Sequence, residues 1–448
     1  MSRTIIGCPD APIIQVDLKA GIDGYHPNTI PKTYAIQVIT PIFGGGTEPG
    51  INDPVTLIRP SSIRGHLRFW WRATQGAKCS RVKELRRREG EIWGTTDNTS
   101  AVSVKVSINP QKPGHVEPCA VFERDRNGYY KSFPTFRPNY PAYALFPFQG
   151  KKPDGTEAKA PSSGTVNTEF YLTVHFPQDM VKDVEAAVWA WVNFGGIGAR
   201  PRRGCGALYC NDFAPPAADR MGEWFKSAQH LYELPTTQHA REWPTLTTMP
   251  LVSKQMHLPM EAWSLAVGLM REFRQGVGIG RNPGRQQNRP GRSRWPEPDA
   301  LRAFTGQGSL EHLSSMTLQE LGENPAFPRA EFGLPIVFHF KDKEDSPNNS
   351  ELYPEDAKRM ASPIILRPLA IKSTNKAVVM VLRLAAPAPT ALELKNKKKA
   401  PEIKARHIRR SELAAYQNSP MANRSNDGSA LEAFIAYAKE KGFKEVTP

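Results

Sequence analysis

Residues 196–206 read Gly-Ile-Gly-Ala-Arg-Pro-Arg-Arg-Gly-Cys-Gly, which places four glycines and a proline in one short run. Neither a helix nor a strand continues through such a run, because glycine weakens both and proline removes a backbone donor. The preceding segment, 181–194, has Val184, Val188 and Trp191 at helical spacing, and 207–213 is predicted as a strand. The run is therefore a loop that joins a helix to a strand, which fixes one junction of the fold.

The elements before this junction give a recognisable order. Strands are predicted at 34–40, 102–108 and 168–176, where β-branched and aromatic residues alternate with polar ones. A helix is predicted over 61–74 because serines that favour helix starts precede apolar residues at helical spacing. The order strand, helix, strand, strand, helix, strand is that of a ferredoxin-like domain.

Two stretches of this first half do not fit into that order. The basic stretch 78–88 is predicted to be mobile or to face RNA. The segment between 108 and 168 is rich in proline and glycine and is predicted to be an insertion with little structure of its own.

The second half is predicted to form another, less regular unit of the same kind. A helix is expected at 260–276 and another near 429–441, with strands near 332–340, 362–371 and 377–385, but the sequence shows no strong first strand. The predicted fold class is α+β, with two ferredoxin-like (RRM-like) domains that carry long loop insertions. The domains are expected at 30–215 and 251–448, joined by a linker at 216–250 in which 219–233 can form a helix.

Charge indicates the class of partner. The chain has 59 Lys and Arg against 44 Asp and Glu, a formal net charge of +15. Such a surplus favours association with a polyanion, so nucleic acid is the leading partner. An anionic membrane surface is the second reading, but no basic amphipathic helix, lipidation signal or long apolar stretch supports it.

The cysteines and the N-terminus indicate a cytoplasmic protein. The five cysteines (Cys8, Cys79, Cys119, Cys205 and Cys210) are odd in number and scattered, which suits free thiols in a reducing compartment. The first residues show no secretory signal.

The glycine-rich loop is the most specific functional signal. Glycines permit positive φ, and successive backbone N–H groups in such a loop can form a nest for a phosphate. Arg200, Arg202 and Arg203 lie inside the loop and add positive charge at that place. The alternative is a tight structural turn whose arginines are only solvated.

The predicted helix at 61–74 carries a second signal. Arg64, Arg68 and Arg72 recur every four residues and so line one face, which can follow a phosphate backbone, and Arg59 can join them. The alternative is an ordinary solvated face. Trp70 and Trp71 are expected in the core rather than as platforms for base stacking.

A third signal is the loop 276–295, GVGIGRNPGRQQNRPGRSRW, in which no acidic residue interrupts five arginines. Such a loop buries little of itself and is predicted to become ordered on a polyanion, although a disordered surface loop has the same composition. Its arginines are Arg281, Arg285, Arg289, Arg292 and Arg294.

Signals for catalysis are weak. The sequence has no phosphate-binding P-loop, dinucleotide fingerprint or paired CxxC, so no cofactor and no metal are predicted. His66 can in principle act as a general base on a 2′-hydroxyl, but a histidine among arginines is more often a hydrogen-bonding residue. Asp53 lies in an Asn-Asp-Pro turn and is interpreted as a turn residue rather than a metal ligand.

Several of these motifs together resemble a known family. IT-PIFGGG (39–46), IRPSSIRGHLRFWWRA (58–73), EIWG (91–94) and GIGARPRRGCG (196–206) resemble the repeat-associated mysterious proteins, or RAMPs. Within that superfamily they are most similar to the first-numbered subunit of type III-B CRISPR (Cmr) complexes. The resemblance is closest over 34–213. It is looser in the second half, where it rests on 276–302 and the paired strands after 332.

The resemblance implies a subunit with two RAMP domains that binds guide RNA without cutting it. It would cap the 3′ end of the guide and the backbone filament, beside other RAMP subunits, with target RNA as a further candidate partner. Carried over by motif, Arg59, Ser62, Arg64, Arg68 and the loop 196–206 would lie near the guide. The alternative enzyme is a metal-independent ribonuclease that processes guides, and the third reading is a structural cap that contacts acidic proteins. The segments 110–165 and 395–410 match no feature of the family.

Together, the residue and family arguments give the following predicted RNA-binding set: Arg59, Ser62, Arg64, Arg68, Arg72, Gly196, Gly198, Arg200, Arg202, Arg203, Gly204, Gly206, Arg281, Arg285, Arg289, Arg292 and Arg294.

Overall fold

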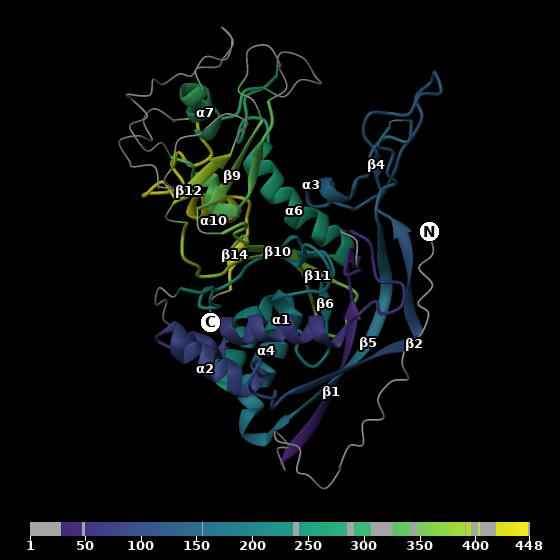
Figure 1. Ribbon diagram of the computed structural model, residues 1–448, viewed down its shortest axis with the longest axis vertical. Helices are drawn as coiled ribbons and strands as arrows, with labels where there is room; N and C mark the ends of the chain where they lie inside the picture. The colour runs from purple at the N-terminus through teal and green to yellow at the C-terminus, as the bar shows by residue number, and fades with distance from the viewer. Residues whose placement is uncertain are drawn as a thin grey trace, which may run out of the picture.

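The computed structural model shows an α+β protein built around two sheets of the same topology (Figure 1). The structure describes residues 28–446, except 47–49, 155, 236–241, 285–290, 306–325, 341–346, 348, 356, 390, 396–401 and 404–417. Cys8, Arg285, Arg289 and most of the Lys-rich segment 395–410 therefore lie outside the described residues.

The first sheet is ferredoxin-like. Its strands have the order β2-β5-β1-β6, and every neighbouring pair is antiparallel. Helices α1 and α4 pack on one face of it, and α1 begins at Pro60, whose missing N–H costs nothing at the first turn. The elements are β1 (Thr29–Val38), α1 (Pro60–Ala73), β2 (Ser103–Pro118), β5 (Ser163–Pro177), α4 (Val181–Phe194) and β6 (Leu208–Tyr209).

The second sheet repeats this order of elements. Its strand order β10-β11-β7-β14, read with the two helices, again gives strand, helix, strand, strand, helix, strand. The predicted fold class is therefore confirmed. The elements are β7 (Leu251–His257), α6 (Pro259–Gln275), β10 (Ile364–Ala370), β11 (Ala377–Arg383), α10 (Ala430–Glu440) and β14 (Lys444–Glu445).

The first strand of this unit, β7, is not evident from the sequence. Only Leu251 and Val252 are apolar and buried; of the three polar residues that follow, Ser253 is half-buried, and Lys254 and Gln255 are exposed. The second half of β7 borders an open groove, so it lacks the alternation of apolar and polar side chains by which a strand is recognised in a sequence.

A third, smaller sheet is inserted in the second unit. Its antiparallel order is β13-β12-β9-β8, and α7 (Glu297–Thr305) precedes it in the chain. The expected strand at 332–340 falls here, as β8, and not in the second ferredoxin-like sheet. The strands are β8 (Ile336–Phe338), β9 (Ser350–Pro354), β12 (Leu392–Lys395) and β13 (Glu402–Ile403).

Two segments have more regular structure than predicted, and the prediction of little structure for 108–168 was wrong. The basic stretch 78–88 enters helix α2 (Val82–Trp93), which forms because Leu85, Ile92 and Trp93 bury one face of it, and the alternative that this stretch faces RNA stays a prediction. The segment 108–168 extends the β2–β5 pairing from Pro113 to Pro118 as a two-stranded ribbon. It also contains β3 (Ala120–Val121), β4 (Thr135–Phe136) and α3 (Ala142–Leu145).

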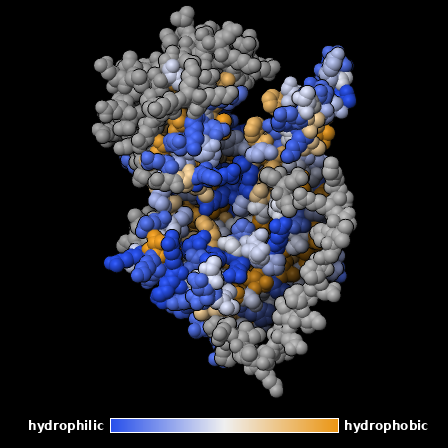
Figure 2. Space-filling model, viewed as in Figure 1, coloured by the Kyte–Doolittle hydropathy of each residue, from blue (hydrophilic) through white to orange (hydrophobic). Residues whose placement is uncertain are grey.

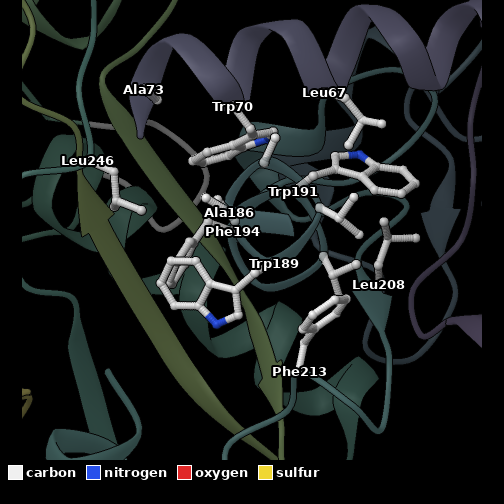
Figure 3. Close-up of a cluster of buried hydrophobic side chains, with 14 of the residues drawn as sticks. Leu67, Trp70, Ala73, Ala186, Trp189, Trp191, Phe194, Leu208, Phe213 and Leu246 are labelled. Carbon is white, nitrogen blue, oxygen red and sulfur yellow. The ribbon is translucent and has the colours of Figure 1, made fainter. Parts of the chain in front are cut away.

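One hydrophobic core joins the two units. Trp189 and Phe194 of α4 and Phe225 of α5 (Met221–Tyr232) belong to the same buried cluster as Ile365 of β10 and Met380 of β11. Figure 3 shows Trp70 of α1 and Trp191, Trp189 and Phe194 of α4 directed into this cluster. Both tryptophans of the Trp70-Trp71 pair are buried, as predicted.

The opposite face of the second sheet carries its own helices. Leu366 and Val379 point into a separate cluster with Met270 of α6 and Phe434 of α10. Both faces of this sheet are covered over its central strands, so β11 is almost wholly buried and β10 is buried along its whole length. These two strands leave no open face on which bases can stack.

Arginine side chains bond the two units across this core. Arg367 of β10 is fully buried, and its guanidinium donates to the carbonyl oxygens of Gly195 (2.5 Å), Leu208 (2.8 Å) and its neighbour Pro368 (3.0 Å). Burial lowers the pKa of Arg367 to about 9, so it still carries its charge at neutral pH. A second hydrogen bond joins the units in the opposite direction: Arg203 of the first unit donates to the carbonyl of Ile364 in β10 (3.1 Å).

Among the described residues no helix is long and apolar enough to cross a membrane. The four described cysteines, Cys79, Cys119, Cys205 and Cys210, are buried and form no disulfide with one another.

Replacing Arg367 by alanine is expected to lower the free energy of unfolding by roughly 3 kcal/mol, because the carbonyls of Gly195 and Leu208 lose a buried donor. Urea denaturation followed by tryptophan fluorescence measures this change. Exposed Lys372, changed to alanine, is the control. An Arg367→Ala midpoint equal to that of the control would contradict the role given to Arg367.

Candidate nucleic-acid interface

Three segments distant in sequence meet at one small pocket of about 220 Å³. The loop after β1 contributes Gly44 and Gly45, the start of α1 contributes Arg59, Ser62 and His66, and the glycine-rich loop contributes Gly198 and Ala199. We call this the glycine pocket. Among the described residues its lining has no acidic side chain, so the residues of the two strongest sequence motifs converge at a space to which the described lining contributes no carboxylate.

Backbone N–H groups supply much of the polarity of the glycine pocket. The N–H groups of Gly44, Gly45 and Gly198 donate no hydrogen bond to another described residue, whereas that of Ala199 donates to the carbonyl of Phe43 (2.6 Å). All three glycines have positive φ, at 69°, 105° and 76°. Unpaired amides of consecutive residues in such conformations are the elements of an anion-binding nest.

Packing also requires glycine in the loop. A Cβ on Gly198 would lie 2.6 Å from the carbonyl oxygen of Phe43, and one on Gly206 would lie 2.0 Å from that of Ile197. Gly196, Gly204 and Gly206 are buried. Of the four predicted loop glycines, Gly198 alone lines the pocket. The other three positions need glycine because the chain packs too closely there for a side chain.

Arg59 is held in place by Asp53. The Asp53 carboxylate accepts hydrogen bonds from Nε of Arg59 (3.1 Å) and from the N–H groups of Val55 (2.9 Å) and Thr56 (3.0 Å). The Thr56 N–H and then Arg59 lower the pKa of Asp53 to about 2. Asp53 is thus a turn residue, as predicted, and it orients Arg59 at the rim of the glycine pocket.

The three arginines on one face of α1, Arg64, Arg68 and Arg72, contact helix α2. Arg64 donates to the carbonyl of Trp93 (2.6 Å), while Arg68 and Arg72 both bond to one carboxylate oxygen of Glu89, at 2.7 and 2.8 Å. These arginines are half-buried and Glu89 is buried. Their contacts therefore hold α1 and α2 together, and an RNA contact by them stays a prediction. Figure 2 shows hydrophilic side chains gathered over the region of α1 and α2.

The three arginines of the glycine-rich loop differ in environment. Arg202 donates to the carbonyl of Ser362 and lies over the ring of Phe69 (5.2 Å), and Arg203 bonds to Ile364, so both connect the two units. Burial lowers the pKa of each to about 10. Arg200, with left-handed φ (59°), is exposed and makes no side-chain hydrogen bond or ion pair with another described residue. Arg200 is the loop arginine that is available to a ligand.

The loop 276–295 is ordered at both of its ends. Arg292 donates to Asp299 (2.6 Å), and Arg294 donates to the amide oxygen of Asn282 (2.7 Å). These contacts within the protein contradict the expectation of a loop that cannot bury itself, at least at its described ends. Arg281 is half-buried and has no such partner among the described residues.

His66 faces the glycine pocket without a titratable partner there. Its ring lies parallel to that of Trp191, with centroids 6.3 Å apart, and its burial lowers its pKa. The imidazole is therefore neutral at pH 7. The part of the chain that the structure describes contains no group of three His, Cys, Asp or Glu residues that could hold a metal ion.

Sequence reasoning missed two members of the site, Gly44 and Gly45. They lie in the run Gly-Gly-Gly at 44–46, which breaks regular structure and belongs to a family motif but was not predicted as a binding element. The signal that could have found them is that run of three glycines in the loop between the predicted strand at 34–40 and the predicted helix at 61–74.

Gly198→Ala is expected to cost more stability than Gly128→Ala. Both glycines have φ near +80°, so alanine brings about 1–2 kcal/mol of backbone strain at either position. At Gly128 the added Cβ meets open space, whereas at Gly198 it meets Phe43 and Ile42. Thermal denaturation of the two variants measures the difference, and equal midpoints would contradict the tight packing of the loop.

Comparison with known proteins supports the resemblance seen in the motifs. The family model of the RAMP superfamily matches residues 35–209, which span β1 to β6. The chain is 25% identical over 182 residues to the CRISPR system Cmr subunit Cmr1-2 of Pyrococcus furiosus, covering 39% of this chain and 92% of that protein. It is 24% identical over 192 residues to Cmr1-1 of the same organism, covering 42% of this chain and 47% of that protein. The predicted resemblance to RAMPs and to these Cmr subunits is confirmed.

Solved structures also match at low sequence identity. The crystal structure of Cmr1 from Pyrococcus furiosus in its apo form matches with a TM-score of 0.41 and 13% identity, covering 93% of this chain and 99% of that one. A cryo-EM structure of the type III-B Cmr-beta complex bound to cognate target RNA contains a chain that matches with a TM-score of 0.46 and 12% identity, covering 92% of this chain and 100% of that one.

Proposed function

We propose that this chain is a non-catalytic RNA-binding subunit of a type III-B CRISPR effector complex. It holds the guide RNA, caps the 3′ end of the guide and of the backbone filament, and contacts other RAMP subunits in the cytoplasm. The domains proposed for it are 30–215 and 251–448, with 216–250 between them. The similarity to the Cmr subunits of Pyrococcus furiosus supports the complex, and the charge of the chain supports RNA as the ligand.

The glycine pocket is the observation that carries the RNA-binding part of the proposal. N–H groups of Gly44, Gly45 and Gly198 that bond to no other described residue, the hydroxyl of Ser62 and the guanidinium of Arg59 belong to a pocket whose described lining has no carboxylate. Each of these groups recognises a phosphate oxygen and none recognises a particular base. The pocket therefore suits a subunit that binds many guide sequences equally well.

The same pocket is poorly equipped for cleavage. Metal-independent cleavage of RNA needs a base at the 2′-hydroxyl and an acid at the leaving oxygen. Within the described lining His66 and Arg59 are the ionisable side chains; burial lowers the pKa of His66 below its usual value, and Arg59 is engaged by Asp53. This favours binding over the alternative function of a guide-processing ribonuclease.

The test is binding of a guide-like RNA over a series of salt concentrations by the wild-type protein and Arg200→Glu. Arg200 is exposed and takes no part in joining the units, so its reversal tests RNA contact without disturbing Arg202 and Arg203. We expect affinity to fall about tenfold or more at low salt. The slope of log affinity against log salt should become shallower by roughly 0.7 for each phosphate that the variant no longer neutralises.

Arg126→Glu is the matched control, because Arg126 is exposed on the β2–β5 insertion and has the same change of charge. Equal affinity of Arg200→Glu and wild type would contradict a role of the loop in RNA binding. The same samples are examined on a denaturing gel. Specific cut products that disappear in His66→Ala would establish the ribonuclease alternative instead.

A further inference from the structure

A second cavity with a positive lining lies in the C-terminal half of the chain. It has a volume of about 1030 Å³ and is bounded by β7, by α6 and the turn after it, and by the residues that follow α10. We call it the C-terminal groove. Apart from Arg281, none of the residues that line it belongs to the predicted RNA-binding set.

The charged side chains of the C-terminal groove come from four separate places in the chain. Lys254 belongs to β7, Arg271 to α6, Arg281 to the loop after α6, and Lys441 follows α10. Lys441 is neutralised by Glu272 at 2.8 Å. Lys254, Arg271 and Arg281 make no ion pair or side-chain hydrogen bond with another described residue. Within the described part of the chain, the groove thus gathers three unpaired cations.

The ends of two helices do not account for this charge. Both α6 and α10 end at the groove, and each C-terminus carries about −0.5 of a charge, so together they attract roughly one cation. The lining of the groove has four cations against the one carboxylate of Glu272, and Glu261, which contacts His257 of the lining at 3.2 Å, adds a second negative charge beside it. A net charge of +2 remains, which is more than the two helix ends balance.

The lining of the C-terminal groove offers apolar surface beside its positive charge. It therefore suits an extended chain in which charged and apolar groups alternate. A Cβ built on Gly268 meets nothing within 4 Å, so the helix surface is open at that position. Leu265 is 44% exposed, and Phe443 is half-buried at the other side. Single-stranded nucleic acid binds where a positive groove follows its backbone and apolar or aromatic side chains contact its bases and sugars.

We propose that the C-terminal groove binds the phosphodiester backbone of single-stranded RNA, with Lys254, Arg271 and Arg281 as the phosphate contacts. The identification of RNA rests on the proposed function of the chain, whereas the position of the site does not. The groove adds an RNA contact in the second unit, distinct in its lining residues from the glycine pocket of the first.

The experiment measures binding of a poly(U) RNA of about 16 nucleotides, the length that single-strand binding sites occupy, to the full chain. The groove variant combines Lys254→Glu, Arg271→Glu and Arg281→Glu. A milder variant, Lys254→Gln with Arg271→Gln, changes only exposed side chains and guards against loss of folding. The control combines Lys226→Glu, Lys372→Glu and Lys376→Glu, three exposed lysines outside the groove lining.

We expect the groove variant to lose tenfold or more in affinity at low salt with a shallower salt dependence, the milder variant to lose less, and the control to lose little. Combination with Arg200→Glu should multiply the two losses, because the sites share no residue. Weaker binding of Arg200→Glu with unchanged binding of both groove variants would overturn the groove and leave the proposed function standing. Weaker binding of the groove variants with unchanged Arg200→Glu would instead contradict the role of the glycine-rich loop in RNA binding and leave the groove standing.

Polyglutamate distinguishes RNA from an acidic protein partner. One outcome is that the wild-type protein still binds polyglutamate at salt concentrations where poly(U) is released, and that the groove variant loses its binding of polyglutamate but keeps its binding of poly(U). This outcome would overturn the RNA proposal in favour of an acidic polypeptide. If the wild-type protein binds poly(U) more tightly than polyglutamate at every salt concentration, and the groove variant shows no such preference, the result supports RNA as the ligand.

Discussion

Arg367 places a positive charge in the interior of the protein without an anionic partner among the described residues. Its guanidinium is balanced by carbonyl dipoles, two of which, from Gly195 and Leu208, belong to the first unit. A buried charge of this kind is tolerated only when its donors are satisfied, so the two units must hold one fixed relation for Arg367 to remain buried. Gly195 directly precedes the glycine-rich loop and Leu208 follows it, so this single side chain fixes both ends of the loop.

The candidate RNA site depends on that arrangement. The loop is bonded at its middle as well: Arg203 donates to Ile364, the first residue of β10, and Arg202 donates to Ser362, two residues before it. The carbonyl of Arg203 also accepts a hydrogen bond from Trp263 of α6 (2.7 Å). With the rest of the loop immobilised in this way, Gly198 and Ala199 are held against the loop after β1 and the start of α1. The free N–H groups of the glycine pocket are thus arranged before any ligand arrives, which lowers the entropic cost of binding.

The local pattern of the sequence was enough to predict most of the first unit and, in the second, the helices α6 and α10 but not α7. The helix at 181–194 was predicted with its observed bounds because Val184, Val188 and Trp191 recur at helical spacing and a glycine pair ends it. Strand β7 was missed because its polar half borders the C-terminal groove, and helix α2 was missed because its charges conceal a narrow apolar face. In both cases the deciding contacts come from parts of the chain that sequence spacing does not reveal.

For the site, the sequence identified the right segments but not the role of each arginine. Arg202 and Arg203 look identical to Arg200 in the sequence, yet they bond to carbonyls of the second unit because the fold brings β10 beside the loop. Likewise, Glu89 lies far from Arg68 and Arg72 in sequence and engages both of them. Spacing along one helix shows which residues share a face, but it does not show what that face meets.

The most direct test of the central claim, that the glycine pocket holds RNA phosphates, is photo-crosslinking of a guide-like RNA to the wild-type protein, with the crosslinked peptides located by mass spectrometry. The account predicts crosslinks in peptides that contain Gly44 and Gly45, the start of α1 near Ser62, and Gly198 to Arg200. Crosslinks that fall elsewhere in the chain and leave all three of these segments unmodified would contradict it.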